Sequence, residues 1–368
     1  MKRSGLIILS IAILISTLGV FTIYSSTYQK EQKQFKALYT RQIFWLILGL
    51  AAFFIVSQID YRHFWDITYF LYIFTILLLS MVVMFGVVRL GAQRWLKVAW
   101  VNFQPSEIAK LTIVIFLARY FSKKTIDSIA SAVARFKILK GVIAPFLFVI
   151  IPVGLIVGQP DLGSGAMIFI VFIMILFFSG IKLKYVFMLI GAIIASLPIL
   201  WRFLLFDYQK ERLLVFLDPN IDPLGAGYTI IQSKIAIGSG GLWGRGWLSG
   251  TQSQLHFLPE SHTDFIFAAF SEQWGFFGSL LLLVLYYMII RYGLLIARRT
   301  KDDFARILAF GLTAMLGTQV FINIAMNMGL APVVGLPLPL MSYGGSSMLV
   351  TFISLGILAN IDKTRTVF

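Results

Sequence analysis

Residues 5–24 read GLIILSIAILISTLGVFTIY, an apolar stretch without a charged side chain. About 17–25 such residues in a row predict a transmembrane helix, because a helix of that length crosses the hydrocarbon core of a bilayer. Lys2 and Arg3 precede the stretch as in a secretory signal, but no small-residue cleavage site follows before Tyr24. We therefore expect a retained signal-anchor helix.

Nine further apolar stretches follow the first. Together they predict an all-α polytopic membrane protein with ten transmembrane helices, forming a single integral membrane domain over residues 1–368. Residues 204–263 are the predicted large extracytoplasmic loop between helices seven and eight, and connections this long are usually functional. The nine stretches lie at about residues 42–58, 67–88, 107–121, 142–158, 165–180, 185–203, 264–290, 306–328 and 341–360.

The composition agrees with this fold class. Apolar residues make up 59% of the chain and charged residues 13%, against roughly 45–50% and about 25% in average soluble domains. These values exclude a soluble globular protein, a disordered protein and a coiled coil. The absence of cysteine excludes disulfides, thiolate metal sites and a cysteine nucleophile, and three histidines leave little room for a multi-histidine metal site.

The basic excess of the chain reads as a topology signal and gives no reason to expect a nucleic-acid partner. Lys and Arg number 31 against 16 Asp and Glu, for a net charge of +15. With a cytoplasmic N-terminus, the predicted inner segments hold 17 basic and six acidic residues, and the outer segments and span ends hold 13 and nine. The positive-inside rule favours this orientation, and ten spans then put both termini in the cytoplasm.

The first polar group on the predicted outer side surrounds the start of the fourth span. Arg94 precedes it, and Gln104 and Ser106 flank a proline, so we expect Ser106 to cap the helix. Glu107 and Lys110 are three residues apart and share a helix face. They form either a structural ion pair or one wall of a polar cavity, with Arg94 and Lys110 available for phosphate oxygens.

Two further segments hold polar candidates. Asp161 lies in QPDLGS (159–164), before the sixth span, where an Asp is either a helix cap or a functional acid. The large outer segment includes DYQKER (207–212), with Lys210 and Arg212. It also carries six glycines between residues 238 and 250.

The strongest candidates lie at the end of that segment, in LPESHTDFIF (258–267). Glu260, His262 and Asp264 are three potential proton carriers within five residues, just where a span is predicted to begin. Ser261 and Asp264 also have the spacing of a helix capping box. Both a cap and a catalytic carboxylate therefore remain open for Asp264.

The last polar segment is GLPLPLMSYGGSS (335–347), which includes Ser342 and Tyr343. It follows Asn323 and Asn327, which are four residues apart and so share a helix face. Small residues here are consistent with close helix packing. The prolines and glycines alternatively indicate irregular backbone beside a water-filled cavity.

In this order and spacing, the four segments resemble the SEDS family, the shape, elongation, division and sporulation proteins of bacteria. The resemblance covers essentially the whole chain and is closest to the elongation branch of the family. GTQSQL (250–255) and PVVG (332–335) resemble that branch, whereas the division branch typically carries lysine at the Val334 position. His256 stands where family members often have Glu, so any role of that acid does not transfer.

The resemblance implies a peptidoglycan glycosyltransferase that polymerises lipid II, with Asp264 as its essential carboxylate. It implies a bacterial cytoplasmic (inner) membrane protein whose active site faces outside. It also implies a class B penicillin-binding protein as the transpeptidase partner, together with other membrane proteins of the elongation complex.

The chemistry of this reaction suits the predicted position of Asp264. Displacing a pyrophosphate from an α-linked sugar to give a β-linked product is one inversion, which needs one general base. We expect Asp264 to deprotonate the GlcNAc 4-hydroxyl of the acceptor. Burial would raise its pKa and nearby cations would lower it. Candidate substrate-binding residues are Arg94, Gln104, Glu107, Lys110, Asp161, Lys210, Arg212, Glu260, His262, Ser342 and Tyr343, with Lys234 and Arg245 as further outer cations.

The cofactor and two other functions stay open. Oxygen ligands such as Asp161, Glu260 and Asp264 suit a divalent cation, Mg²⁺ or Mn²⁺, although the sequence assigns no metal ligands; no organic cofactor is expected. A lipid II flippase would use the same cavity and cations without covalent chemistry, and a scaffold that activates a partner synthase would need none of the outer carboxylates. An O-antigen-ligase-like transferase is the nearest enzymatic alternative.

Overall fold

The computed structural model confirms the helical fold class predicted from the sequence. It describes residues 2–28, 37–89, 92–98, 101–122, 139–225, 227–255 and 257–364. Outside these ranges lie His256 and several of the basic residues used to predict the orientation, namely Lys123, Lys124, Arg135, Lys137 and Arg365.

Within the described residues, a long helix coincides with each of the ten predicted stretches. Eight apolar helical segments have the length and composition to cross a membrane, α9 is shorter and apolar, and α6 has 17 residues. The number ten therefore stays a prediction. The helices are α1 Arg3–Thr27, α3 Leu38–Gln58, α5 Thr68–Phe85, α6 Pro105–Phe121, α8 Ala144–Gly158, α9 Leu162–Phe178, α10 Leu183–Ile199, α14 Ile266–Arg299, α15 Asp303–Asn327 and α16 Gly345–Thr364, with π-helical turns at Leu139–Ile143 before α8 and Leu200–Leu204 after α10.

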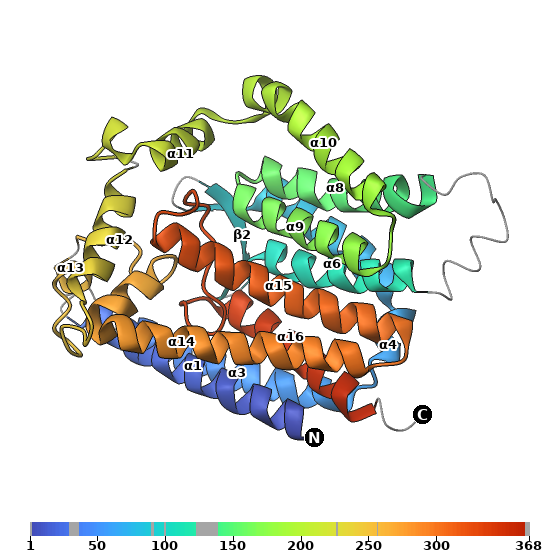
Figure 1. Ribbon diagram of the computed structural model, residues 1–368, viewed down its shortest axis with the longest axis horizontal. Helices are drawn as coiled ribbons and strands as arrows, with labels where there is room; N and C mark the ends of the chain where they lie inside the picture. The colour runs from blue at the N-terminus through green and yellow to red at the C-terminus, as the bar shows by residue number, and fades with distance from the viewer. Residues whose placement is uncertain are drawn as a thin grey trace.

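The centre of the bundle is formed by α15 and α16, most of whose residues are buried. Helix α3 packs on α16, α14 packs on α15, and α6 and α9 cover the other side of α15 (Figure 1). Helix α10 stands apart at one edge of the bundle, and Val186 is its single buried residue among those described. An apolar helix exposed on nearly all sides is suited to contact lipid.

A small sheet, which the sequence did not predict, connects α5 to α6. Its strands are β1 Val87–Arg89, β2 Ala92–Val98 and β3 Val101–Phe103, paired antiparallel in the order β1-β2-β3. Helix α5 ends at Phe85, so the last residues of the predicted span 67–88 are extended. Strand β2 carries Arg94 toward the site described below.

The segment 204–263 is more regular than the predicted loop. It contains several short helices that lie at one end of the bundle (Figure 1). These are α11 Asp207–Leu217, the 3₁₀ turn Pro219–Ile221, α12 Tyr228–Ser239 and α13 Thr251–Gln254; another short helix, α4 Arg62–Asp66, joins α3 to α5.

Helix α14 breaks at Gly275, where φ is 65° and ψ is −161°. The glycine-rich stretch seen in the sequence fits into this break: Phe276 N donates to Gly241 O over 2.9 Å, and Gly246 N donates to Gln273 O over 3.1 Å. Backbone groups freed by the break thus find partners, as a broken membrane helix requires. A Cβ at Gly244 would overlap the carbonyl oxygen of Gln273, so the close approach needs glycine.

Candidate active site

Asp264 lies in a turn before α14, outside the helix. The predicted capping box is wrong, because α14 begins at Ile266 with Phe265 as its N-cap and no side-chain cap. The turn is built instead around Glu260, which has a φ of 48° and whose carbonyl oxygen accepts from Thr263 N at 3.0 Å and from Phe265 N at 3.3 Å. The Asp264 side chain is therefore not used to close the helix.

Two asparagines of α15 fix this turn from the other side. Asn323 Nδ2 and Asn327 Nδ2 each donate to the main-chain oxygen of Asp264 over 2.9 Å. Asn327 Oδ1 accepts from Ala268 N over 3.1 Å, and Asn323 Nδ2 also donates to Leu336 O over 2.7 Å. The backbone of Asp264 is thus tied to α15, to the first turn of α14 and to the segment after α15.

The Asp264 carboxylate shares its surroundings with Arg94. A Cβ built on Gly335 would lie 3.5 Å from Asp264 Oδ2 and 3.6 Å from Arg94 Nη1, so both groups border the same position. Gly335 has a φ of 70°, a backbone conformation that is unfavourable for residues with a side chain. The missing side chain leaves open the space between acid and guanidinium.

Asp161 also pairs with Arg94. Its carboxylate lies 3.9 Å from Arg94 Nη1 and accepts from Ser164 N at 3.1 Å, which confirms it as the N-cap of α9. The other oxygen accepts from Gln104 Nε2 and Ser106 Oγ, both over 3.4 Å. The prediction that Ser106 caps α6 is wrong, because the helix begins two residues earlier, at Pro105, and Gln104 takes the cap position. The hydroxyl of Ser106 faces Asp161 instead.

Arg212 adds a second guanidinium to the site. It comes from α11, and its Nη1 donates to Val333 O over 3.4 Å while its Cζ lies 5.7 Å above the Tyr208 ring. Tyr208 in turn donates to Pro160 O over 3.3 Å, an oxygen that Arg94 also contacts. Burial, together with the nearby Arg94 charge, lowers the pKa of Arg212. The long segment before α14 thereby reaches the same site as β2.

Burial raises the pKa of Asp264 to about 6, and the negative charge of Glu260 adds to the rise. The charges of Arg94 and Arg212 act in the opposite direction but are outweighed. A carboxyl group in this range can hold or release a proton near neutral pH, which is the property that a general base needs.

Two of the candidate residues form a separate buried pair on α6. Lys110 Nζ lies 2.8 Å from Glu107 Oε1 and donates to Gln319 Oε1 over 3.0 Å. Gln319 Nε2 donates to Pro337 O over 2.9 Å, so the pair is linked to the segment that carries Gly335. Both charged side chains are 2–3% exposed.

Lys210 does not join the group around Asp264 through any described contact. It pairs with the exposed Asp207 on the same helix, over 3.3 Å. Ser342 serves the backbone: its hydroxyl donates to Thr263 O over 2.6 Å and accepts from Leu338 N over 2.7 Å.

Tyr343 and His262 meet beside the Asp264 turn. Tyr343 N donates to His262 O over 2.9 Å, and their ring centroids are 6.0 Å apart. Together with the Ser342 hydrogen bond to Thr263 O, the Tyr343 hydrogen bond joins the segment after α15 to the turn that holds Asp264. The sequence motif SYGGSS therefore supports the site through backbone contacts.

The described residues contain no group of three or more His, Cys, Asp or Glu side chains arranged to hold a metal ion. Mg²⁺ is often bound by one or two carboxylates plus substrate phosphates, and the donors present fit that mode only. Asp161 and Asp264 would be the protein ligands, both beside Arg94.

Several residues of the site were not among the sequence candidates. Asn323 and Asn327 had a signal, their shared helix face, but no role was predicted from it. Tyr208 and Gly335 gave no signal of their own, because their roles depend on contacts between distant segments.

The chain resembles known proteins over most of its length. A family model described as a cell cycle protein, FTSW_RODA_SPOVE, matches residues 5–367. The peptidoglycan glycosyltransferase MrdB of Escherichia coli strain K12 is 45% identical over 325 residues, covering 88% of this chain and 85% of MrdB. A chain of a peptidoglycan synthase complex that coordinates polymerization and crosslinking aligns with a TM-score of 0.79 and 32% identity, covering 97% of each. RodA of Thermus thermophilus aligns with a TM-score of 0.71 and 27% identity, covering 97% of this chain and 96% of RodA.

Proposed function

The chain belongs to the cell cycle protein family of FtsW, RodA and SpoVE, and from that premise we propose that it is a peptidoglycan glycosyltransferase of cell elongation. Its substrate is lipid II, a disaccharide peptide on undecaprenyl pyrophosphate. The protein joins the glycan chain carried by one undecaprenyl pyrophosphate to the GlcNAc 4-hydroxyl of a further lipid II.

The observation that carries this proposal is the meeting of the Asp264 carboxylate with Arg94 at Gly335, with the Arg212 guanidinium close by at Val333. Asp264 has a pKa of about 6 and is oriented by backbone contacts, and Arg94 and Arg212 come from separate segments to the same place. A base beside two cations suits a reaction in which a hydroxyl attacks and a pyrophosphate leaves.

In the proposed reaction, Asp264 accepts the proton of the GlcNAc 4-hydroxyl. The oxygen attacks the anomeric carbon of the donor MurNAc, the new carbon–oxygen bond forms, and the bond to pyrophosphate breaks with inversion. Undecaprenyl pyrophosphate leaves with its negative charge near Arg94 and Arg212, since guanidinium groups bind phosphate oxygens through paired hydrogen bonds. A bound Mg²⁺ or Mn²⁺ would supply further charge neutralisation of the pyrophosphate.

The partner of the proposed enzyme is a class B penicillin-binding protein that crosslinks the glycan, alongside other membrane proteins of the elongation complex. Support comes from the aligned chain of the synthase complex that couples polymerization to crosslinking. The chain is proposed to lie in the bacterial cytoplasmic membrane with both termini inside and Asp264 outside, where lipid II presents its sugars.

The proposal is tested by incubating the purified full chain, alone and with its transpeptidase partner, with lipid II and measuring glycan polymer. Asp264→Asn keeps the size of the side chain and removes the base, so polymer is expected to be lost. Asp207→Asn is the matched control, because Asp207 is exposed on α11 and its described contact is with Lys210. That variant is expected to polymerise as the wild type does.

Equal polymer from Asp264→Asn and the wild type would overturn the role of Asp264. Movement of lipid II across vesicles without polymer would identify a flippase. If polymer forms only when a partner synthase is present, and forms equally well when the outer carboxylates of this chain are replaced, the chain is a scaffold.

A further inference from the structure

A second concave site lies at the opposite end of α15 from Asp264. It is a cavity of about 430 Å³ beside Asp302 and Phe304, at the start of the helix. Asn327, which bonds the main chain of Asp264, is the last residue of the same 25-residue helix. At a rise of about 1.5 Å per residue the helix is about 37 Å long, against roughly 30 Å for the hydrocarbon core of a bilayer. The cavity and Asp264 therefore lie on opposite sides of the membrane.

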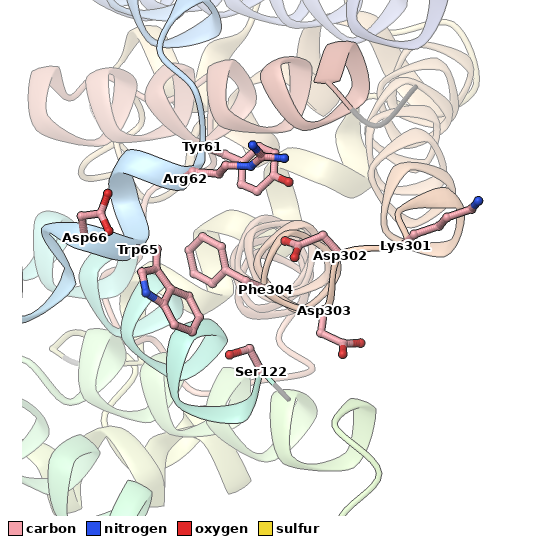
Figure 2. Close-up of a pocket in the computed structure, with 9 residues that line it drawn as sticks. All are labelled: Tyr61, Arg62, Trp65, Asp66, Ser122, Lys301, Asp302, Asp303 and Phe304. Carbon is pink, nitrogen blue, oxygen red and sulfur yellow. The ribbon is translucent and has the colours of Figure 1, made fainter. Parts of the chain in front are cut away.

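Aromatic rings form one wall of this cavity. Phe304 is buried and contacts both Tyr61 and Trp65, with ring centroids 6.3 Å and 5.2 Å apart. Figure 2 shows the three rings in one group, with the carboxylate of Asp302 directed toward them and Lys301 directed outward. An aromatic wall with a carboxylate beside it is suited to bind an organic cation.

The charged residues of the cavity have both signs. Arg62 and Lys301 are the cations, and Asp66, Asp302 and Asp303 are the acids. Asp303 pairs with Arg306 over 2.6 Å, so two carboxylates, Asp66 and Asp302, remain opposite the two cations. The cavity therefore offers a ligand both signs of charge in equal number. A zwitterion, which carries a phosphate and an ammonium a few ångströms apart, complements both sets.

The position of the cavity favours a lipid as the source of that zwitterion. Tyr61 follows the end of α3, Ser122 follows the end of α6, and Asp302 precedes the start of α15. The lining residues thus lie within a few positions of the ends of long apolar helices, at the level of lipid headgroups. The volume is in the range of small-ligand pockets.

We propose that this cavity binds the headgroup of an ethanolamine phospholipid from the leaflet opposite to Asp264. The ammonium group donates to Asp302 beside the aromatic wall, and Arg62 and Lys301 bind the phosphate. The site is independent of the proposed catalysis, because its residues lie at the far end of α15.

The test measures lipid affinity of the purified full chain in detergent by native mass spectrometry. The probes are phosphatidylethanolamine, phosphatidylcholine and phosphatidylglycerol with identical acyl chains. Phosphatidylcholine has no N–H donor and phosphatidylglycerol has no amine, so each is expected to bind about tenfold more weakly than phosphatidylethanolamine.

Two variants test separately the part of the cavity that binds the ammonium group and the part that binds the phosphate. Asp302→Asn keeps the helix cap that Asp302 forms with Ala305 N over 2.9 Å, since asparagine caps equally well. It is expected to weaken the binding of phosphatidylethanolamine about tenfold and to strengthen that of phosphatidylglycerol, whose negative charge the Asp302 carboxylate repels. Lys301→Gln, at an exposed position, is expected to weaken both lipids alike. Asp207→Asn, on α11, is the control for the loss of one acid and should change neither.

Equal affinities of the three lipids for the wild type overturn the proposal, as does an unchanged phosphatidylethanolamine affinity in Asp302→Asn. Saturable binding of a lysine-rich peptide at Asp302, with no preference among the lipids, overturns it as well. In that case the cavity belongs to a protein partner.

Discussion

Asn327 holds the main-chain oxygen of Asp264 through a 2.9 Å hydrogen bond from its carboxamide, while its own oxygen accepts from Ala268 N over 3.1 Å. Asn323, one turn earlier on α15, donates to the same Asp264 oxygen over 2.9 Å. The two carboxamides fix the backbone from which the proposed base projects, so we assign them as positioning residues.

Asn327→Ala is therefore expected to lower the maximal rate of polymerisation by about 10- to 100-fold, because a small displacement of a catalytic group is costly. The KM for lipid II should change less, since Asn327 lies behind the turn and contacts its main chain. The measurement is the initial rate of polymer formation against lipid II concentration.

The matched control is Asn360→Ala. Asn360 is also buried and also bonds backbone, accepting from Tyr61 N and donating to Ser57 O, both over 3.0 Å, but at the other end of the bundle. Both variants should lose about 1–3 kcal/mol of stability from unmatched polar groups. Equal losses of maximal rate in the two variants would contradict the positioning role.

The pH dependence of polymerisation should report the ionisation of Asp264. Burial and the charge of Glu260 raise its pKa to about 6, and the base acts only when ionised. The rate at low substrate is therefore expected to be constant above that pH and to fall as pH decreases through about 6. A decline that begins only near the ordinary carboxyl value of 3.8 would contradict the assignment.

Glu260→Gln provides an internal check on that profile. Removing the negative charge favours ionisation of Asp264, so the acid side of the profile should move to lower pH. Glutamine can still accept from the Thr263 hydroxyl, which lies 3.0 Å from Glu260 Oε2. A profile that stays in place would show that another group controls the rate.

The membrane-spanning helices were predictable because long apolar stretches depend on local composition alone. The Asp161 cap was predictable for the same reason, as a local pattern before a helix. The capping box at Ser261 and Asp264 failed because distant residues decide the turn: two asparagines of α15 bond the Asp264 oxygen and hold it outside the helix.

The break in α14 also could not be predicted locally. Residues 264–290 read as one continuous span, and the glycines at 238–250 read as a loop. Only their contact shows that the loop supplies hydrogen bonds to the broken helix at Gly275. The small sheet at 87–103 was missed because its strands have only three to seven residues.

Gly275→Ala should destabilise the protein strongly. Its φ of 65° and ψ of −161° lie in a region essentially restricted to glycine, at a cost to alanine of about 1–3 kcal/mol, and the added methyl group would also overlap Gly244 N. The midpoint of thermal unfolding in detergent should fall well below that of the wild type.

Gly238→Ala is the control, because Gly238 lies in helix α12 and a Cβ there meets nothing within 4 Å. It should be neutral or stabilising by up to about 1 kcal/mol, and similar losses in both variants would contradict this account of the break.

The buried Glu107–Lys110 pair is either a structural ion pair or one wall of the substrate cavity, and two variants distinguish these roles. Glu107→Gln leaves the Lys110 ammonium without its carboxylate 2.8 Å away, at a cost of about 3–5 kcal/mol. The double variant Glu107→Gln, Lys110→Met removes both charges and should recover most of that stability. If the pair is only structural, polymerisation recovers with the stability. If Lys110 forms a wall of the substrate cavity through Gln319 and the segment that carries Gly335, stability returns and activity does not. We expect the second result, and thermal unfolding measured alongside polymer formation on the same samples distinguishes the two.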